Sequence, residues 1–78
     1  MMNIQIADIT LHIDESLDAE NRARIETAIR AVDGVVSVHA QTDRPHLMIV
    51  GYNPEKTSSA AILEAATAQG IHAELIGL

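Results

Sequence analysis

The feature of this sequence that most constrains its fold is the order in which the spacing of apolar residues changes along its 78 positions. From Asp8 to Ile13, apolar and polar residues alternate, which is typical of a strand with one buried face. A helix is expected to begin near Ser16 or Asp18, because apolar residues then recur every three to four positions. They form a stripe of Ile25, Ala28, Ile29 and Val32. Gly34 follows, where a helix commonly ends in a left-handed residue.

Two further strands are predicted in the middle of the chain. Residues 35–41 alternate, which places Val36, Val38 and Ala40 on one face and Ser37, His39 and Gln41 on the other. Residues 42–45 are expected to form the turn that follows. The next run, residues 46–52, is apolar on both faces, with Met48, Val50 and Tyr52 on one and Leu47 and Ile49 on the other. A strand buried on one side only would not need the second apolar set.

A second helix is predicted from Ser58 to Gln69, with Thr57 as its N-cap and Gly70 at its end. The last strand, residues 71–76, sets Ile71, Ala73 and Leu75 against His72, Glu74 and Ile76. The order is therefore β-α-β-β-α-β, the split βαβ arrangement, with both helices on one face of a four-stranded antiparallel sheet. We expect one α+β domain over residues 1–78, an open-faced sandwich with strand order 4-1-3-2.

The composition excludes several classes of function. The formal charge is −6, from eleven acidic and five basic residues, which argues against nucleic acid as a partner. Cysteine is absent, so disulfides, thiolate metal sites and thiol nucleophiles are excluded. The first residues, "MMNIQIADITLHI", have no basic flank and no sustained apolar run, so neither export nor membrane insertion is expected. A cytoplasmic location is the expectation.

Three stretches give the chain a family resemblance: "GVVSVHA" after the first helix, "IVGYNPEKTSS" before the second, and "AQGIHAEL" near the end. They are similar to the GV-strand, the Y-D-P turn with its following T-S, and the A-x-G-Y-x-A close of the heavy-metal-associated domain family. That family comprises the small ferredoxin-like modules of copper chaperones, mercury-binding proteins and metal-pumping P-type ATPases. The resemblance spans nearly the whole chain and implies the ferredoxin-like fold and a place in metal transport.

The metal loop of the family is missing from this sequence. Relatives carry G-M-T-C-x-x-C between the first strand and the first helix, where two thiolates bind a soft ion such as Cu(I). In this register Glu15, Ser16 and Leu17 replace G-M-T, while Asp18 and Asn21 replace the two cysteines. Carboxylate and amide oxygens suit hard cations rather than Cu(I). The resemblance therefore implies the fold of a metallochaperone-like domain with a degenerate CxxC motif, but not its thiolate chemistry.

Four carboxylates, Asp14, Glu15, Asp18 and Glu20, gather where the first helix begins. Acidic residues there complement the helix dipole. Three acid-to-arginine pairs also stand four residues apart in the favourable orientation: Asp18 with Arg22, Glu20 with Arg24 and Glu26 with Arg30. Helix stabilisation is the expected role of the cluster. A hard cation held by Asp14, Glu15 and Asp18 is the alternative, although the spacing of a calcium loop is absent.

The histidines suggest a different metal site. His12, His39 and His72 are expected on the sheet face away from the helices, and His12 and His72 on adjacent antiparallel strands. If the two lie directly opposite, they can share Zn(II), Ni(II) or Cu(II), with Glu74 as a third ligand. A register shift of two residues would separate them. Otherwise these histidines are ordinary polar residues of a solvated face, and His46 a solvated loop residue.

Leu47 and Ile49 are expected on the open face of the sheet, between His12 and His39, with Ile76 extending the apolar surface. Apolar side chains grouped on a sheet face mark association, although scattered ones are normal. For catalysis, no serine has a histidine partner, and the carboxylates lie on an open helix end. The sequence predicts a non-enzymatic domain that acts by contact with a protein partner or in a homodimer. The alternative is a divalent transition metal bound through surface histidines.

Overall fold

The computed structural model describes residues 5–40 and 46–76 of the chain. Its elements follow the order β1 (Ala7–Ile13), α1 (Ala19–Arg30), β2 (Val35–Ala40), β3 (Leu47–Tyr52), α2 (Ser59–Thr67) and β4 (Ala73–Ile76). This confirms the predicted βαββαβ order. The expected turn at residues 42–45 and the placement of Gln41 lie outside the described residues.

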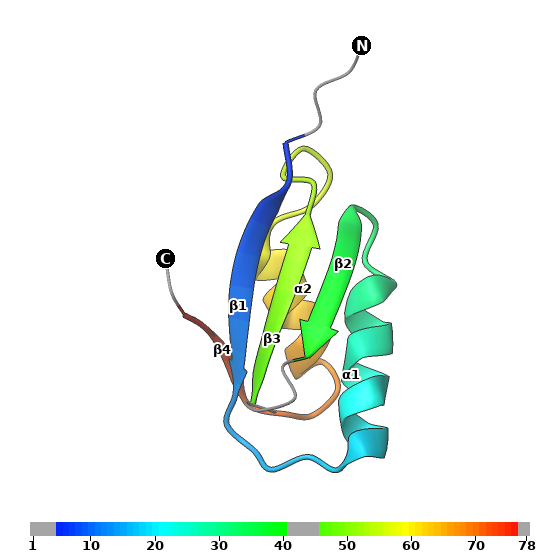
Figure 1. The fold of residues 1–78 in the computed structure, drawn as a ribbon, viewed down its shortest axis with the longest axis vertical. Coiled ribbons are helices and arrows are strands. Elements are labelled where there is room, and N and C mark those ends of the chain that lie inside the picture. Colours follow the sequence, from blue (N-terminus) through cyan, green and yellow to red (C-terminus); the bar gives the residue numbers. More distant parts are fainter. Residues whose placement is uncertain (1–4, 41–45, 77–78) are drawn as a thin grey trace.

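The four strands form one antiparallel sheet in the order β2-β3-β1-β4, which is the predicted order 4-1-3-2. Figure 1 shows α2 behind β3 and α1 beside β2, with the face of the sheet away from α2 turned to the viewer. Helix α1 packs against β2 and against α2, and α2 packs against β4. The result is an α+β open-faced sandwich of the ferredoxin-like type.

The core between sheet and helices is aliphatic apart from one tyrosine. Strand β1 contributes every second residue, as alternation predicts, and β3 contributes Met48, Val50 and Tyr52. The helices contribute two buried residues each, spaced four apart as expected for a narrow apolar stripe. The buried set is Ile9, Leu11, Ile13, Ile25, Ile29, Val38, Met48, Val50, Tyr52, Ile62, Ala66 and Ile71.

Both helices begin at residues whose side chains cap the backbone. Asp18 is the N-cap of α1, and Ser58, not Thr57, is the N-cap of α2, where its Oγ accepts a hydrogen bond from the Ala61 N–H at 3.2 Å. Serine and threonine are both good N-caps, so residue type alone did not decide between adjacent positions. Gly34 and Gly70 follow the helices with φ of 103° and 84°, the conformation predicted for residues that end a helix.

The predicted face of Val36 is wrong, because a β-bulge interrupts β2. Val35 pairs with Tyr52 and Ser37 with Gly51, so Val36 is the extra residue. Val36 is 60% exposed, whereas Val35 packs against the core and Val38 is buried. From Ser37 onward the predicted alternation holds. Within the described residues, no helix has the length and apolar character needed to span a bilayer.

Candidate functional site

Asp18 and Asn21, which the sequence resemblance aligns with the family cysteines, are joined by a helix cap. The backbone N–H of Asn21 donates to Asp18 Oδ1 at 2.8 Å, and the N–H of Arg22 donates to the Asp18 carbonyl at 3.0 Å. Asp18 is exposed and has the extended backbone of an N-cap. Its carboxylate therefore satisfies a helix N–H group, as the helix-stabilising interpretation predicts.

Glu15 is also engaged with the backbone. Its Oε2 accepts a hydrogen bond from the N–H of His72 at 2.7 Å, and the N–H of Asp14 donates to the His72 carbonyl at 2.9 Å. These bonds tie the loop after β1 to the segment before β4. Asp14, Glu15 and Asp18 therefore do not converge as the alternative of a hard cation requires, since two of the three cap different N–H groups.

The three predicted acid-to-arginine pairs do not form. Across residues 5–40 and 46–76, the only ion pairs within 4.0 Å are those of His12 with Asp14 and Glu74. Arg30 instead donates from Nη2 to the Val38 carbonyl at 3.1 Å, joining α1 to the edge strand β2. An exposed i,i+4 ion pair contributes only about 0.3–0.5 kcal/mol, which a backbone hydrogen bond readily exceeds.

His12 and His72 do not lie opposite each other. The register pairs His12 with Glu74, and β4 begins at Ala73, so His72 precedes the strand. The expected direct pairing is therefore wrong by two residues. Its physical reason is the hydrogen bonding of His72, whose N–H and carbonyl are both held by the loop after β1.

The side chain that does meet His12 from β4 is Glu74, and Asp14 joins them. His12 Nδ1 lies 2.7 Å from Asp14 Oδ1 and 3.8 Å from Glu74 Oε1. One ligand atom from each residue lies within 4.8 Å of the other two. We call these three residues the β1–β4 corner cluster. In the described part of the chain, it is the only group of three histidine and acidic side chains placed to hold one metal ion.

Asp14 is the member of the corner cluster that the sequence reasoning placed elsewhere. It stands two residues after His12, and β1 ends between them at Ile13. Residues two apart on a strand point to the same face, so the alternation that oriented His12 could have located Asp14 as well. The imidazole of His46 is also near, with ring centres 6.4 Å apart and planes tilted by 39°.

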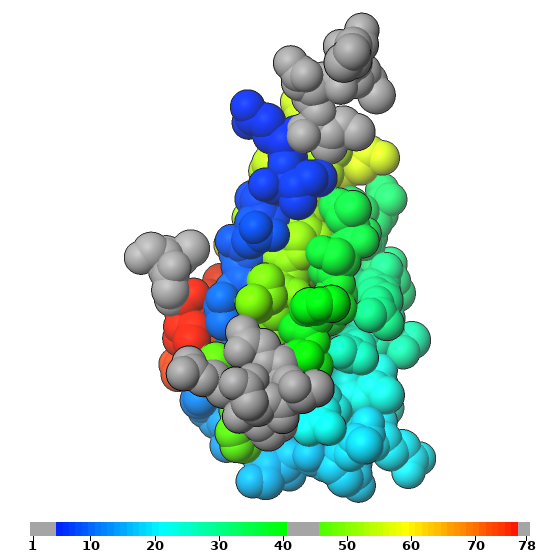
Figure 2. Space-filling model, in the orientation of Figure 1, coloured from blue at the N-terminus to red at the C-terminus, as the bar shows by residue number. Residues whose placement is uncertain are grey.

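The face of the sheet away from the helices, which we call the open sheet face, is ordered in rows across the strands. One row runs His39, Ile49, Thr10, Ile76, and the next runs Leu47, His12, Glu74. A third row contains Ser37, Gly51 and Asp8. Figure 2 shows this face, with β1, β3 and β2 side by side. Leu47 and Ile49 lie at its centre and are half-buried, and Ile76 is 37% exposed at the edge strand.

Acidic groups lie at two ends of the open sheet face, beside its apolar residues. Asp8 and Glu74 are exposed at opposite ends, and the Asp14 side chain, next to Glu74, is 48% exposed. None of the side chains described on this face belongs to lysine or arginine. The described charged side chains of this face are therefore acidic and lie beside an aliphatic patch.

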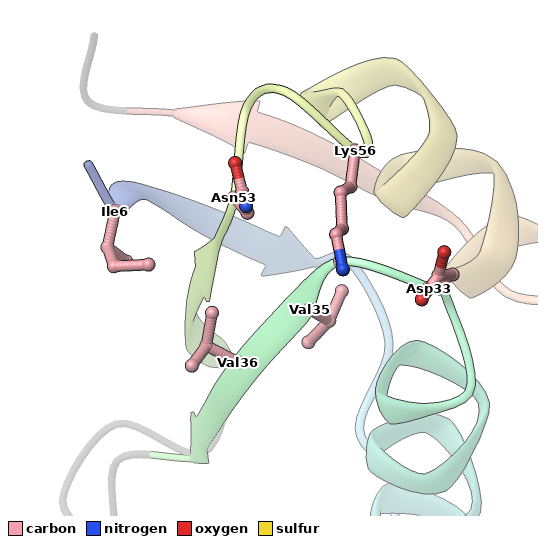
Figure 3. A pocket seen from close by; sticks show the side chains of 7 residues that line it. Ile6, Asp33, Val35, Val36, Asn53 and Lys56 are labelled. Atoms are coloured by element: carbon pink, nitrogen blue, oxygen red, sulfur yellow. The ribbon is translucent and has the colours of Figure 1, made fainter. Parts of the chain in front are cut away.

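A shallow hollow of about 340 Å³ lies at the end of the sheet far from the corner cluster (Figure 3). The β-bulge turns Val36 into it beside Ile6, and Lys56 and Asn53 approach from the loop after β3. Gly34 forms part of its wall. A Cβ atom there would lie 2.8 Å from the Lys56 Cβ, so the backbone approaches the lysine stem closely. The hollow is lined by side chains of both charges, Lys56 and Asp33, and its lining does not indicate one class of ligand.

Neither a family model nor a curated protein matches the sequence. Solved structures do share the fold. Oxidized MerP from Ralstonia metallidurans is 20% identical with a TM-score of 0.81, over 91% of this chain and 97% of that one.

Two further matches are N-terminal domains of larger proteins. The N-terminal domain of a potential copper-translocating P-type ATPase from Bacillus subtilis, in the Cu(I)-loaded state, is 22% identical with a TM-score of 0.81, over 91% and 88% of the two chains. The N-terminal domain of PacS from Synechocystis is 24% identical with a TM-score of 0.77, over 91% and 98%. These similarities establish a common fold.

Proposed function

We propose that this chain is a non-enzymatic domain of the heavy-metal-associated type that acts by protein contact. In this proposal a basic partner protein docks on the open sheet face, in metal trafficking or a context derived from it. The observation that carries the proposal is the aliphatic patch of Leu47 and Ile49, with exposed Asp8 and Glu74 at the two ends of the same face.

The residues at the family metal loop support contact rather than soft-metal delivery. Cu(I) is bound by soft sulfur ligands, and the chain contains no cysteine. Asp18 and Asn21 are bound to each other through the N-cap hydrogen bond of α1. Several of the proteins that share the fold are described as copper-binding domains or parts of P-type ATPases. A domain with this fold and no thiolate ligands can still act by binding another protein through its surface.

The negative charge of the chain favours a basic partner protein over a second copy on the open sheet face. A second copy would bring another chain of formal charge −6 against the same acidic side chains, which opposes a homodimer held by this face. A partner with apolar side chains ringed by lysine or arginine would cover Leu47 and Ile49 and pair with Asp8 and Glu74. Burying aliphatic surface contributes about 25 cal/mol per Å², and complementary charge mainly accelerates association and selects the partner.

Nuclear magnetic resonance with two matched peptides tests the proposal. The ¹⁵N-labelled chain is titrated with a peptide of alternating leucine and lysine, and separately with one in which glutamate replaces lysine. We expect saturable amide shifts centred on β3 and β1 for the lysine peptide only. Shifts confined to the helices, or equal shifts with both peptides, would exclude docking of a basic partner here. A stable dimer by light scattering at low salt would favour a second copy instead.

A further inference from the structure

We infer that the β1–β4 corner cluster, His12, Asp14 and Glu74, is a binding site for a borderline divalent cation of the Zn(II) type. The site lies outside the positions of the family cysteines and uses nitrogen and oxygen ligands. It does not depend on the docking function proposed above, because its ligands meet within one copy of the chain.

The spacing of the three donors fits a single ion. Zinc ligands stand about 2.0–2.2 Å from the metal, so two ligands of one ion lie roughly 3–3.5 Å apart. The two distances from His12 Nδ1, 2.7 Å to Asp14 and 3.8 Å to Glu74, bracket that range. Small rotations of the two exposed carboxylates would equalise them, since the Asp14 side chain is 48% exposed and the Glu74 side chain 63%.

The surroundings of the His12 ring nitrogen favour a bound cation. Nδ1 has almost no solvent-accessible surface and makes no hydrogen bond among the described residues. Asp14 Oδ1 is at ion-pair distance, but no hydrogen bond joins it to the ring nitrogen. A buried polar atom without a hydrogen bond costs free energy, and a cation bound between the nitrogen and the Asp14 carboxylate would satisfy both.

The pairing of β1 with β4 fixes the backbone position of Glu74. The register sets it directly opposite His12 on the neighbouring antiparallel strand, where Cβ atoms are about 4.5–5.5 Å apart. Asp14 is fixed in turn by its N–H, which donates to the His72 carbonyl. Two ligands thus come from opposed strand residues and the third from a loop anchored between the same strands.

The ligand atoms of the corner cluster, one nitrogen and carboxylate oxygens, indicate the class of ion. One imidazole nitrogen and two carboxylates are ligands for Zn(II) and similar first-row divalent ions, with water completing the coordination. Calcium takes six to eight oxygen ligands, which this cluster does not supply, and Cu(I) takes sulfur. The two carboxylates balance the charge of a divalent ion. Glu15 and Asp18 do not contribute, because each accepts a backbone hydrogen bond elsewhere.

Titration of the ¹⁵N-labelled chain with zinc chloride alone tests the inference, with calorimetry for stoichiometry. We expect saturation at one ion per chain, amide shifts at Ile13, Asp14 and Ala73–Leu75, and a change in the His12 ring nitrogen resonances. His12→Ala should weaken binding by more than about tenfold, and Asp14→Asn and Glu74→Gln by about tenfold each. His72→Ala is the matched control, and it should bind zinc like the parent chain.

Two results would overturn the site. One is no saturable shift up to about 1 mM zinc, the range of very weak binding, which would mean that the cluster is only a histidine held between carboxylates. The other is equal loss of binding in His72→Ala and His12→Ala. Glu74→Gln decides the matter if His12→Ala does not fold, since the exposed Glu74 side chain can change without disturbing the core. Because no peptide is present, either failure leaves the docking proposal untouched.

Discussion

Glu15 and His72 are joined by a hydrogen bond from the His72 N–H to Glu15 Oε2, at 2.7 Å and across 57 positions of sequence. With the bond from the Asp14 N–H to the His72 carbonyl, it holds the loop after β1 against the start of β4. The position of Glu74 opposite His12 follows from this connection, so the bond bears on both stability and the corner cluster.

Replacing Glu15 should loosen the start of β4. In Glu15→Ala the His72 N–H loses its acceptor, at a cost of about 1 kcal/mol or less because the bond is exposed. Amide hydrogen exchange at His72 should accelerate by up to about fivefold, while exchange in α2 stays unchanged. Glu55→Ala, at an exposed glutamate, is the control. Unchanged exchange at His72 would mean that the bond does not hold the strand.

Removing the N-cap of α1 should destabilise the whole domain. Asp18→Ala deletes the acceptor for the Asn21 N–H and should lower the free energy of unfolding by about 1 kcal/mol in urea denaturation. Asp18→Asn keeps an oxygen acceptor and should cost much less. Glu20→Ala removes a first-turn charge without removing a cap, for about 0.3–1 kcal/mol. A loss in Asp18→Asn as large as that in Asp18→Ala would show that charge, not capping, is the contribution.

The two glycines that follow the helices should respond differently to alanine. Both have positive φ, which costs an L-residue roughly 1–2 kcal/mol. At Gly34 the new Cβ would also lie 2.8 Å from the Lys56 Cβ, whereas at Gly70 nothing lies within 4 Å. Gly34→Ala should therefore lower the unfolding free energy clearly more than Gly70→Ala. Equal losses in urea denaturation would contradict the close approach at Lys56.

Introducing thiolates at the positions that the resemblance aligns with the family cysteines should create a soft-metal site. Asp18→Cys combined with Asn21→Cys places two sulfur ligands three residues apart at the start of α1. The double variant should bind one Cu(I) per chain under anaerobic conditions, in competition with a chromogenic chelator, and the parent chain should bind none. Failure of the double variant, with its fold intact by amide spectrum, would mean that the register of the family resemblance is wrong.

Alternation predicted most of the sheet because one face must be buried. Leu11 and Met48 lie where a period of two places them, and so do Leu47 and Ile49 on the other face. The same reasoning failed at Val36 because a bulge inserts one residue into β2 there. Two adjacent valines give no sequence signal for the position of that extra residue. Strand order followed from the βαββαβ pattern, which has few compact solutions.

The candidate site was harder to predict than the fold because it depends on register between strands distant in sequence. A shift of two residues keeps every side chain on its face, so hydrophobic patterning cannot distinguish His72 from Glu74 as the partner of His12. The hydrogen bonds of His72 to the loop after β1 determine which register forms, and the sequence pattern does not indicate these bonds. Which of two adjacent side chains caps a helix is also hard to predict from sequence, as Ser58 shows at the start of α2.

Docking on the open sheet face is tested most directly by Ile49→Asp in calorimetric titration with the leucine–lysine peptide. Ala23→Asp, at an exposed position of α1, adds the same charge to the helical layer. If the apolar centre is the docking site, Ile49→Asp weakens binding by at least tenfold, although it makes the chain more acidic, and Ala23→Asp does not. If attraction between net charges were the whole interaction, both variants would bind the peptide more tightly than the parent chain, and that result would contradict the account.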